Sequence, residues 1–322
     1  MRVLVIGGNR FLGVELTARL LARGDAVTLL NRGSLADPFG ALVERLRADR
    51  GTDAFDAAVA GRTWDAVVDF ALFDGAQARR LGRTLAGRVA HVIAISTGQV
   101  YLVREPRPAL AIESDYDGPV LPAPPTPRDE EDWRYGIEKR DAEDELRRSG
   151  LPHTLFRIPM VHGGRDHKRR IDSILWRLMD RGPILLTRPE APVRHVFSGA
   201  VVEAILAALA RGPTDRAWNL SWDESMTARA FVEAVARTFG VEPNLRVVPT
   251  ATLLAAGLEP TLACSVNSEW MSTIDASLAR RELGFVHPPL ASWLPQAVHA
   301  TVARWTEPPP SMAQRPHELA LP

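Results

Sequence analysis

Tyr135 and Lys139 lie four residues apart in a charged segment of the 322-residue chain. On a helix this spacing places both side chains on one face, about one turn apart. An ammonium group beside a phenol favours the phenolate, so it lowers the pKa of the tyrosine. Such a tyrosine can exchange a proton with an alcohol or a carbonyl group near neutral pH. Because the same spacing also occurs on solvated helix faces, the pair is informative only together with the elements that precede it.

The most informative of these elements is a glycine-rich segment near the N-terminus. It consists of Gly7, Gly8, Asn9, Arg10, Phe11, Leu12 and Gly13. An apolar run at residues 3–6 precedes it, an amphipathic run at 11–23 overlaps its end, and a second apolar run follows at 26–30. This order predicts a strand, a helix and a strand, in which a tight turn and a helix N-terminus bind a dinucleotide pyrophosphate. Arg10 replaces the middle glycine of the G-x-x-G-x-x-G spacing, and a glycine-rich turn without a nucleotide is the alternative.

The end of the second predicted strand bears on the choice of coenzyme. An acidic residue there binds the adenosine ribose and favours NAD, whereas a basic residue accommodates the 2′-phosphate of NADP. The residues are Asn31 and Arg32, with no acid before Asp37. A guanidinium group forms strong charge-assisted bonds with phosphate, so the sequence favours NADP over NAD. A surface arginine in a turn is the alternative interpretation of Arg32.

The composition limits the class of protein. Hydrophobic residues make up 46% of the chain, and 39 basic residues balance 39 acidic ones. This balance makes nucleic acid an unexpected partner and gives no reason to expect a membrane partner. Cys264 is the one cysteine, which excludes an intramolecular disulfide and fits a cytoplasmic location. No group of residues has metal-ligand spacing, so we expect no metal.

Alternating strand and helix patterns predict an α/β fold with a doubly wound, Rossmann-type parallel sheet. Further strands are expected at residues 46–48, 64–71, 89–96 and 153–158, and a charged helix at 129–148. We expect residues 1–160 to form mainly the dinucleotide-binding domain and 161–306 a smaller α/β substrate lobe, with some chain crossing back. Short extended pieces at 217–220 and 245–248 are assigned to that lobe. Ligands bind outside the carboxyl ends of the strands, where Asn31, Asp49, Asp69 and Thr97 lie.

Two proline-rich segments interrupt these patterns. Residues 102–131 have no periodicity, and a loop of this length is typical of a lid or of a substrate-facing segment, with disorder as the alternative. Residues 307–322 begin with Glu307 and three prolines. We expect this tail not to pack as regular structure.

With these residues in place, the chain resembles the extended or atypical short-chain dehydrogenase/reductases, the NAD-dependent epimerase/dehydratase superfamily, over residues 1–306. The catalytic hydroxyl, tyrosine and lysine of that family match Thr97, Tyr135 and Lys139. The glycine-rich segment and the following Asn31–Gly33 are similar to the subgroup that includes the chloroplast stem-loop-binding proteins. Met160 stands where nucleotide-sugar enzymes often carry an asparagine, which makes nucleotide sugars less expected than other hydroxyl or keto substrates.

The resemblance implies an NAD(P)-dependent oxidoreductase, epimerase or dehydratase that acts on a small molecule, with sugar-like molecules among the candidates, and a homodimer as one candidate assembly. The resemblance and the strand ends together predict further coenzyme-binding residues beyond the glycine-rich segment. They are Asn31, Arg32, Asp49, Arg50, Phe70, Ala71, Lys139 and Ile158. Weaker substrate candidates are Gln99, His162 and Arg194. Packing is the alternative for His162 and His195, and core packing for the tryptophans of the C-terminal half. A dinucleotide-binding protein without turnover, with a regulatory or RNA-binding role, is the competing function.

Overall fold

The structure is a computed structural model that describes residues 1–321, and it divides into two compact units. Unit 1 contains residues 1–159 together with two later segments, 198–221 and 274–286. Unit 2 contains residues 160–197 and 222–273 and the chain from His287 onward. Each unit is therefore built from several stretches of the sequence.

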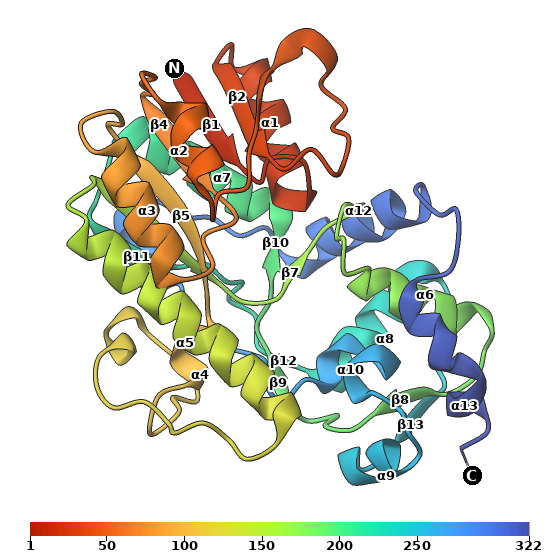
Figure 1. Cartoon of the computed structure of the whole chain (residues 1–322). Coiled ribbons are helices and arrows are strands. Elements are labelled where there is room, and N and C mark those ends of the chain that lie inside the picture. The colour runs from red at the N-terminus through yellow and green to blue at the C-terminus, as the bar shows by residue number, and fades with distance from the viewer. Residues whose placement is uncertain (322) are drawn as a thin grey trace. The chain divides into compact units, whose positions relative to one another are not determined.

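Unit 1 is organised around a seven-stranded parallel sheet with the strand order β11-β6-β5-β4-β1-β2-β3 (Figure 1). The strands are β1 (Arg2–Ile6), β2 (Ala26–Asn31), β3 (Glu44–Arg47), β4 (Ala66–Asp69), β5 (Val92–Thr97), β6 (His153–Ile158) and β11 (Arg216–Asn219). This confirms the predicted Rossmann-type sheet. The piece that we assigned to the other lobe, at residues 217–220, is instead the seventh strand, because its backbone pairs in parallel with β6.

Helices cover both faces of this sheet (Figure 1). They are α1 (Phe11–Ala22), α2 (Asp53–Val59), α3 (Gly75–Leu85), α4 (Gln99–Leu102), α5 (Pro127–Arg148), α7 (Ser198–Arg211) and α11 (Ser277–Leu283), with 3₁₀ turns η1 (Gly40–Leu42) and η2 (Glu113–Tyr116). Side chains alternate along a strand, so Leu4 and Ile6 of β1 point to one face, where they pack with Leu81 of α3 and Leu146 of α5. Helices α1 and α7 pack against each other on the opposite face.

Unit 2 is mainly helical and contains three two-stranded sheets. Its helices are α6 (Arg170–Met179), α8 (Ala228–Phe239), α9 (Thr250–Ala255), α10 (Pro260–Ala263), α12 (Leu290–Val302) and α13 (Arg315–Leu319), with 3₁₀ turns η3 (Ser265–Asn267) and η4 (Pro310–Gln314). The strand pairs are β7 (Val161–His162) with β10 (Val196–Phe197), β8 (Ile184–Leu186) with β13 (Leu245–Val247), and β9 (Pro192–Val193) with β12 (Met226–Thr227). Trp222, Phe231 and Trp293 lie in its core, as does Cys264.

The C-terminal tail is a correction to the sequence analysis, because most of it is helical. After the three prolines the chain forms η4 and α13, and Glu318 of α13 is fully buried. Its carboxylate accepts a hydrogen bond of 2.9 Å from Nε of Arg177 in α6, itself fully buried. The prolines indicated an irregular start but gave no sign of the two helical turns after them. The tail is therefore held in unit 2 by its ion pair with Arg177, which is 141 residues away in the sequence.

The proline-rich segment at residues 102–131 also contains regular structure. It includes η2, and the first turn of α5 begins at Pro127, two residues earlier than expected. Tyr116 is buried here, and its ring lies 3.9 Å from the guanidinium carbon of Arg140 and 4.2 Å from that of Arg157. This part of the segment is therefore packed onto unit 1.

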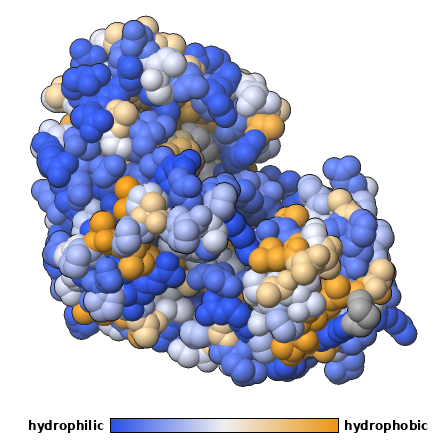
Figure 2. Space-filling view, turned by 60° about the horizontal axis from the view of Figure 1, so that its bottom comes forward, coloured by the Kyte–Doolittle hydropathy of each residue, from blue (hydrophilic) through white to orange (hydrophobic). Residues whose placement is uncertain are grey.

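The surface of each unit carries some apolar side chains among many polar ones (Figure 2). Examples are Ile112 and Val120 in unit 1 and Val247 and Leu254 in unit 2. Among residues 1–321, no helix combines the length and the hydropathy of a membrane-spanning segment.

Candidate active site

The turn between β1 and α1 is built for close approach of backbone to backbone. A Cβ atom on Gly13 would lie 2.6 Å from the Cα atom of Gly8 and 2.7 Å from the carbonyl oxygen of Gly7. Gly7 has a φ of +82°, a conformation that side-chain-bearing residues rarely adopt. Glycine is therefore required at both ends of the segment, which brings the start of α1 against the end of β1.

Arg10 occupies the position where the G-x-x-G-x-x-G spacing has a glycine. Its backbone is extended, with φ −135° and ψ 150°, so the position does not need a glycine. Arg10 is the N-cap of α1, its side chain is exposed, and it makes no capping hydrogen bond. The helix N-terminus therefore carries a positive side chain beside the positive end of the helix dipole, which favours an anion.

The end of β2 presents two guanidinium groups rather than one. In the register of the parallel pair, Asn31 lies opposite Arg47 of β3. The Asn31 side-chain oxygen accepts hydrogen bonds from Arg47 Nη1 and, at 2.9 Å, from the Gly33 backbone N–H. Arg32 is largely exposed and lies 4.0 Å from Asp49. The sequence analysis missed Arg47 because only the strand register places it beside Asn31.

Two side-chain nitrogens at this edge of the sheet are buried and lack a partner within the described residues. They are Nδ2 of Asn31 and Nε of Arg50. Buried donors are nearly always hydrogen-bonded, so both positions suit an acceptor supplied by a ligand. The residues at the carboxyl ends of β1 to β3 thus fit a dinucleotide: a glycine turn, a helix N-terminus, two guanidinium groups and two unsatisfied donors.

Arg50 was expected to contact the coenzyme, and the structure gives one of its guanidinium nitrogens, Nη1, a partner within the chain. Nη1 of Arg50 donates a hydrogen bond of 2.6 Å to the carboxylate of Asp69, which is fully buried at the end of β4. The same carboxylate oxygen accepts the backbone N–H of Ala71 at 2.8 Å. The Arg50–Asp69 ion pair therefore fixes the turn after β4, which includes Phe70 and Ala71.

Lys139 is buried beside the ends of β4 and β5. Its Nζ atom donates hydrogen bonds of 2.7 Å to the carbonyl oxygen of Leu72 and 2.7 Å to that of Ile95. Burial lowers the pKa of Lys139 to about 8, against the opposing influence of the Glu143 and Asp69 carboxylates. Two of the three ammonium hydrogens are thus used by the chain itself, and one remains for another acceptor.

Tyr135 is half-buried on α5, one turn before Lys139. Between them, Gly136 faces the turn that follows β5, where a Cβ atom would lie 2.9 Å from the carbonyl oxygen of Gln99. In that turn the Thr97 hydroxyl accepts the backbone N–H of Gln99 at 3.3 Å. The close packing at Gly136 therefore holds the helix of Tyr135 and Lys139 against the turn that carries Thr97.

Asp132 is a further polar residue at this place that the sequence analysis did not single out. Its carboxylate accepts a hydrogen bond of 3.0 Å from the side-chain amide of Gln99. Burial raises the pKa of the Asp132 carboxyl, and the nearby Glu131 adds to the effect. The sequence feature that could have predicted a role for Asp132 is its position three residues before Tyr135, because this spacing places both residues on one face of the helix.

The other substrate candidates lie in unit 2. His162 is fully buried, its Nε2 atom lies 2.7 Å from Nδ1 of His195, and its ring stacks on those of Phe231 and Trp293. It is a core residue with no surface to offer a ligand. Arg194 is more accessible, and its guanidinium donates to the Ser225 hydroxyl at 3.3 Å. Ile158, a coenzyme candidate in unit 1, is buried at the end of β6, where its carbonyl oxygen accepts the Gly98 N–H at 2.9 Å.

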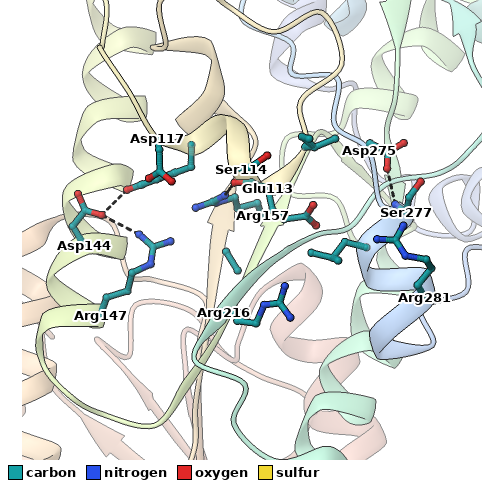
Figure 3. A pocket seen from close by; sticks show the side chains of 14 residues that line it. Glu113, Ser114, Asp117, Asp144, Arg147, Arg157, Arg216, Asp275, Ser277 and Arg281 are labelled. Carbon is teal, nitrogen blue, oxygen red and sulfur yellow. Dashed lines mark hydrogen bonds and ion pairs between the residues drawn. The ribbon is translucent and has the colours of Figure 1, made fainter.

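A pocket of about 780 Å³ lies elsewhere in unit 1 (Figure 3). Glu113, Asp275 and Ser277 line it together with Arg157, which pairs with buried Glu143 at 2.6 Å. None of the residues that the sequence predicted for coenzyme, substrate or catalysis is part of its lining. We therefore do not assign the active site to this pocket on the basis of its volume alone.

The sequence matches no protein-family model and no curated protein. Solved structures do match over nearly the whole chain. A dTDP-glucose 4,6-dehydratase from Bacillus anthracis, in complex with NAD, has a TM-score of 0.74 and 14% identity, covering 94% of this chain and 97% of its own. A UDP-N-acetylglucosamine 4-epimerase from Bacillus cereus has a TM-score of 0.72 and 16% identity, covering 95% and 98%. The dTDP-glucose 4,6-dehydratase DesIV from Streptomyces venezuelae has a TM-score of 0.73 and 19% identity, covering 94% and 98%.

This chain shares their fold. The likeness runs through both units, since each comparison covers at least 94% of the residues. At identities of 14% to 19%, this likeness shows that the fold is shared but does not show that the reaction is.

Proposed function

We propose that the protein is a nicotinamide-dependent oxidoreductase, epimerase or dehydratase of the short-chain dehydrogenase/reductase type. It acts on a hydroxyl or keto group of a small, sugar-like molecule. The observation that carries this proposal is the contact between Gly136 and the turn after β5. It brings the segment of Tyr135 and Lys139 to the segment of Thr97, at the sheet edge where β1 and α1 form the glycine turn. Solved structures with this fold include a dTDP-glucose 4,6-dehydratase and a UDP-N-acetylglucosamine 4-epimerase, which supports the same class.

The residues that would hold the coenzyme follow the carboxyl edge of the sheet. The glycine turn and the N-terminus of α1 would take the pyrophosphate, with Arg10 adding a positive charge. The unsatisfied Nδ2 of Asn31 and Nε of Arg50 would find acceptors there. When bound, the nicotinamide ring supplies a hydride acceptor or donor, and the protein supplies positions and charges.

Within that class, NADP is our preferred coenzyme. Arg32 and Arg47 flank Asn31 at the end of β2, so two guanidinium groups are available for one 2′-phosphate. Arg32 is largely exposed and lies 4.0 Å from Asp49, so its guanidinium group is accessible to a ligand. Five of the similar structures were solved with NAD, so NAD is the competing choice.

In this mechanism Tyr135 exchanges the proton of the reacting hydroxyl or carbonyl oxygen. Lys139, anchored by two carbonyl oxygens, places a positive charge one helical turn away and stabilises the phenolate. The Thr97 hydroxyl forms a hydrogen bond to the same substrate oxygen and helps to orient it. The buried position of Lys139 excludes water from its charge, which strengthens its effect on nearby groups.

The replacement Tyr135→Phe tests the proposal. Phenylalanine keeps the ring but removes the proton-exchanging oxygen, so we expect unchanged coenzyme affinity and at least about a hundredfold lower turnover on a panel of polyols and ketones. The matched control is Tyr116→Phe, because Tyr116 is the buried tyrosine of η2 and bonds to Asp144 at 2.8 Å. Full activity of Tyr135→Phe would favour a dinucleotide-binding protein without tyrosine chemistry.

The similarity to the stem-loop-binding subgroup remains a prediction, which RNA binding by the purified protein would support.

A further inference from the structure

Gln99 and Asp132 form a polar pair beside the proposed catalytic residues. Gln99 is the first residue of α4, two residues after the carboxyl end of β5, and Asp132 lies on α5. The Nε2 atom of Gln99 donates a hydrogen bond of 3.0 Å to Oδ1 of Asp132. The backbone of Gln99 is fixed as well, because its N–H donates to the Thr97 hydroxyl at 3.3 Å. Gln99 is therefore fixed both at its backbone and at its side-chain amide, two residues after Thr97.

This contact determines which way the Gln99 amide points. An ionised carboxylate only accepts hydrogen bonds, so Asp132 can bind the NH₂ group of Gln99 but not its carbonyl oxygen. The carbonyl oxygen Oε1 is consequently directed away from Asp132, and it has no hydrogen-bond donor among residues 1–321. Oε1 is not among the side-chain atoms that are buried without a partner. It is therefore accessible, and a donor from outside the chain can reach it.

The packing around the pair makes this arrangement stable. Gly136, four residues after Asp132, lies against the Gln99 backbone, so α5 and the start of α4 cannot separate without losing that contact. Both Gln99 and Asp132 are half-buried, which strengthens the hydrogen bond between them relative to one in water.

We propose that Asp132 is a positioning residue that fixes the Gln99 amide so that Oε1 accepts a hydrogen bond from a second substrate hydroxyl, on the carbon next to the reacting one. The substrate class is then a vicinal diol or an α-hydroxy ketone. Oxygens on adjacent carbons are close enough to reach Thr97 and Gln99 together, which are two residues apart. This inference rests on the proposed function, because it takes Thr97 as the residue that meets the reacting oxygen.

The experiment compares two probes that differ by one hydroxyl group, trans-1,2-cyclohexanediol and cyclohexanol. Binding of each to the full-length protein saturated with NADP⁺ is measured by calorimetry, so that the result does not depend on turnover. We expect the diol to bind about tenfold more tightly than cyclohexanol, the range of one well-placed hydrogen bond. Gln99→Leu should bring this ratio to about one, with the thermal midpoint and coenzyme affinity unchanged.

Two replacements of Asp132 separate positioning from simple packing. Asp132→Asn can either accept from or donate to the Gln99 amide, so it no longer fixes the orientation of that amide, and the preference for the diol should decrease. Asp132→Glu keeps a carboxylate and should keep the preference. With turning-over substrates the Asn variant should raise KM more than it lowers kcat, because the chemical groups are untouched.

The outcomes distinguish this inference from the proposed function. Equal binding of the two probes by the unaltered protein, including no binding of either, overturns the inference, as does an unchanged ratio in Gln99→Leu. Failure of NADP⁺ and NAD⁺ to bind, or full turnover in Tyr135→Phe, counts against the proposed function instead. Arg134→Ala, an exposed change on the same helix, serves as the control for general effects on α5.

Discussion

A Cβ atom on Gly136 would lie 2.9 Å from the carbonyl oxygen of Gln99, closer than side chains and backbone oxygens normally approach. Helix α5 thus rests directly on the backbone after β5, and the Val103 side chain, 2.7 Å from the same Cβ position, closes the contact. The helix carries the tyrosine and the lysine, and the turn carries the threonine. This one contact links the two halves of the proposed catalytic set.

Gly136→Ala should therefore damage the site more than the fold. The added methyl group must push α5 away from the turn, at a cost of about 1–3 kcal/mol in stability. Since the displacement separates Tyr135 from Thr97, we expect turnover to fall at least about tenfold, because small misplacements of reacting groups are costly. Thermal unfolding and kcat would be measured together, with Glu138→Ala as the exposed control on α5. Wild-type turnover in Gly136→Ala would show that the contact does not position the site.

Lys139→Met should remove the charge that keeps Tyr135 acidic. The carbonyl oxygens of Leu72 and Ile95 then lose their donor, which we expect to cost about 2 kcal/mol in stability. Turnover should fall about a hundredfold or more, because the phenolate is no longer favoured. The chain offers a matched control, since its other lysine, Lys168, is exposed. Equal effects of Lys139→Met and Lys168→Met would contradict the assignment.

The two buried histidines of unit 2 should make its stability depend on pH. Burial lowers the pKa of His195 to about 3, and burial together with the neighbouring His195 places the pKa of His162 well below its usual value. The unfolded chain binds protons below about pH 6.5, whereas the folded protein does not until the pH is much lower. Stability is therefore fully present above about pH 6.5 and decreases as the pH falls from there, by about 1.4 kcal/mol per pH unit for each histidine.

The measurement is denaturant unfolding from pH 7.5 to pH 4.5, followed by the fluorescence of the unit 2 tryptophans. His162→Phe keeps a ring between Phe231 and Trp293, so it should flatten the pH dependence by about one proton. His299→Phe, at an exposed position of α12, is the control and should leave the slope unchanged. A slope that is the same in all three proteins would mean that other groups set the acid limit.

Glu318→Gln should loosen the C-terminal tail. The carboxylate of Glu318 is fully buried and pairs with Arg177 and Arg315, which would each lose an ionic partner. Breaking a buried ion pair on one side costs about 3–5 kcal/mol, and we expect a loss of this size in unit 2. Limited proteolysis at residues 307–319 and the unfolding midpoint would report it. Glu307→Gln, at the exposed start of the tail, should change neither.

The parts of the fold that sequence reasoning found are those with local signals. The strand, glycine turn and helix at residues 3–23 could be predicted because the turn residues and the apolar periodicities are contiguous. The charged helix was found for the same reason, with its start at Pro127 instead of Asp129. The tail was wrongly expected to be irregular because prolines are a local signal, whereas its helix depends on Arg177.

The parts that it missed depend on contacts between distant segments. Arg47 enters the predicted coenzyme site only because β3 pairs with β2 in a register that sets it opposite Asn31. Asp132 matters because α5 packs on the turn of Gln99, 33 residues earlier in the chain. Strand β11 joins the sheet of unit 1 although α6 and α7 separate it from β6 in the sequence. Neither composition nor periodicity contains this information.

A calorimetric titration of the purified protein with NADPH and with NADH tests the proposed coenzyme site without relying on a known substrate. We predict that NADPH binds more tightly, and that Arg47→Ala or Arg32→Ala removes most of the difference while NADH affinity stays the same, because each guanidinium group contacts the extra phosphate. Preferential binding of NADH would overturn the role of the two arginines and leave the nicotinamide-dependent chemistry in place. Binding of neither coenzyme would contradict the proposal that the carboxyl edge of this sheet is a dinucleotide site.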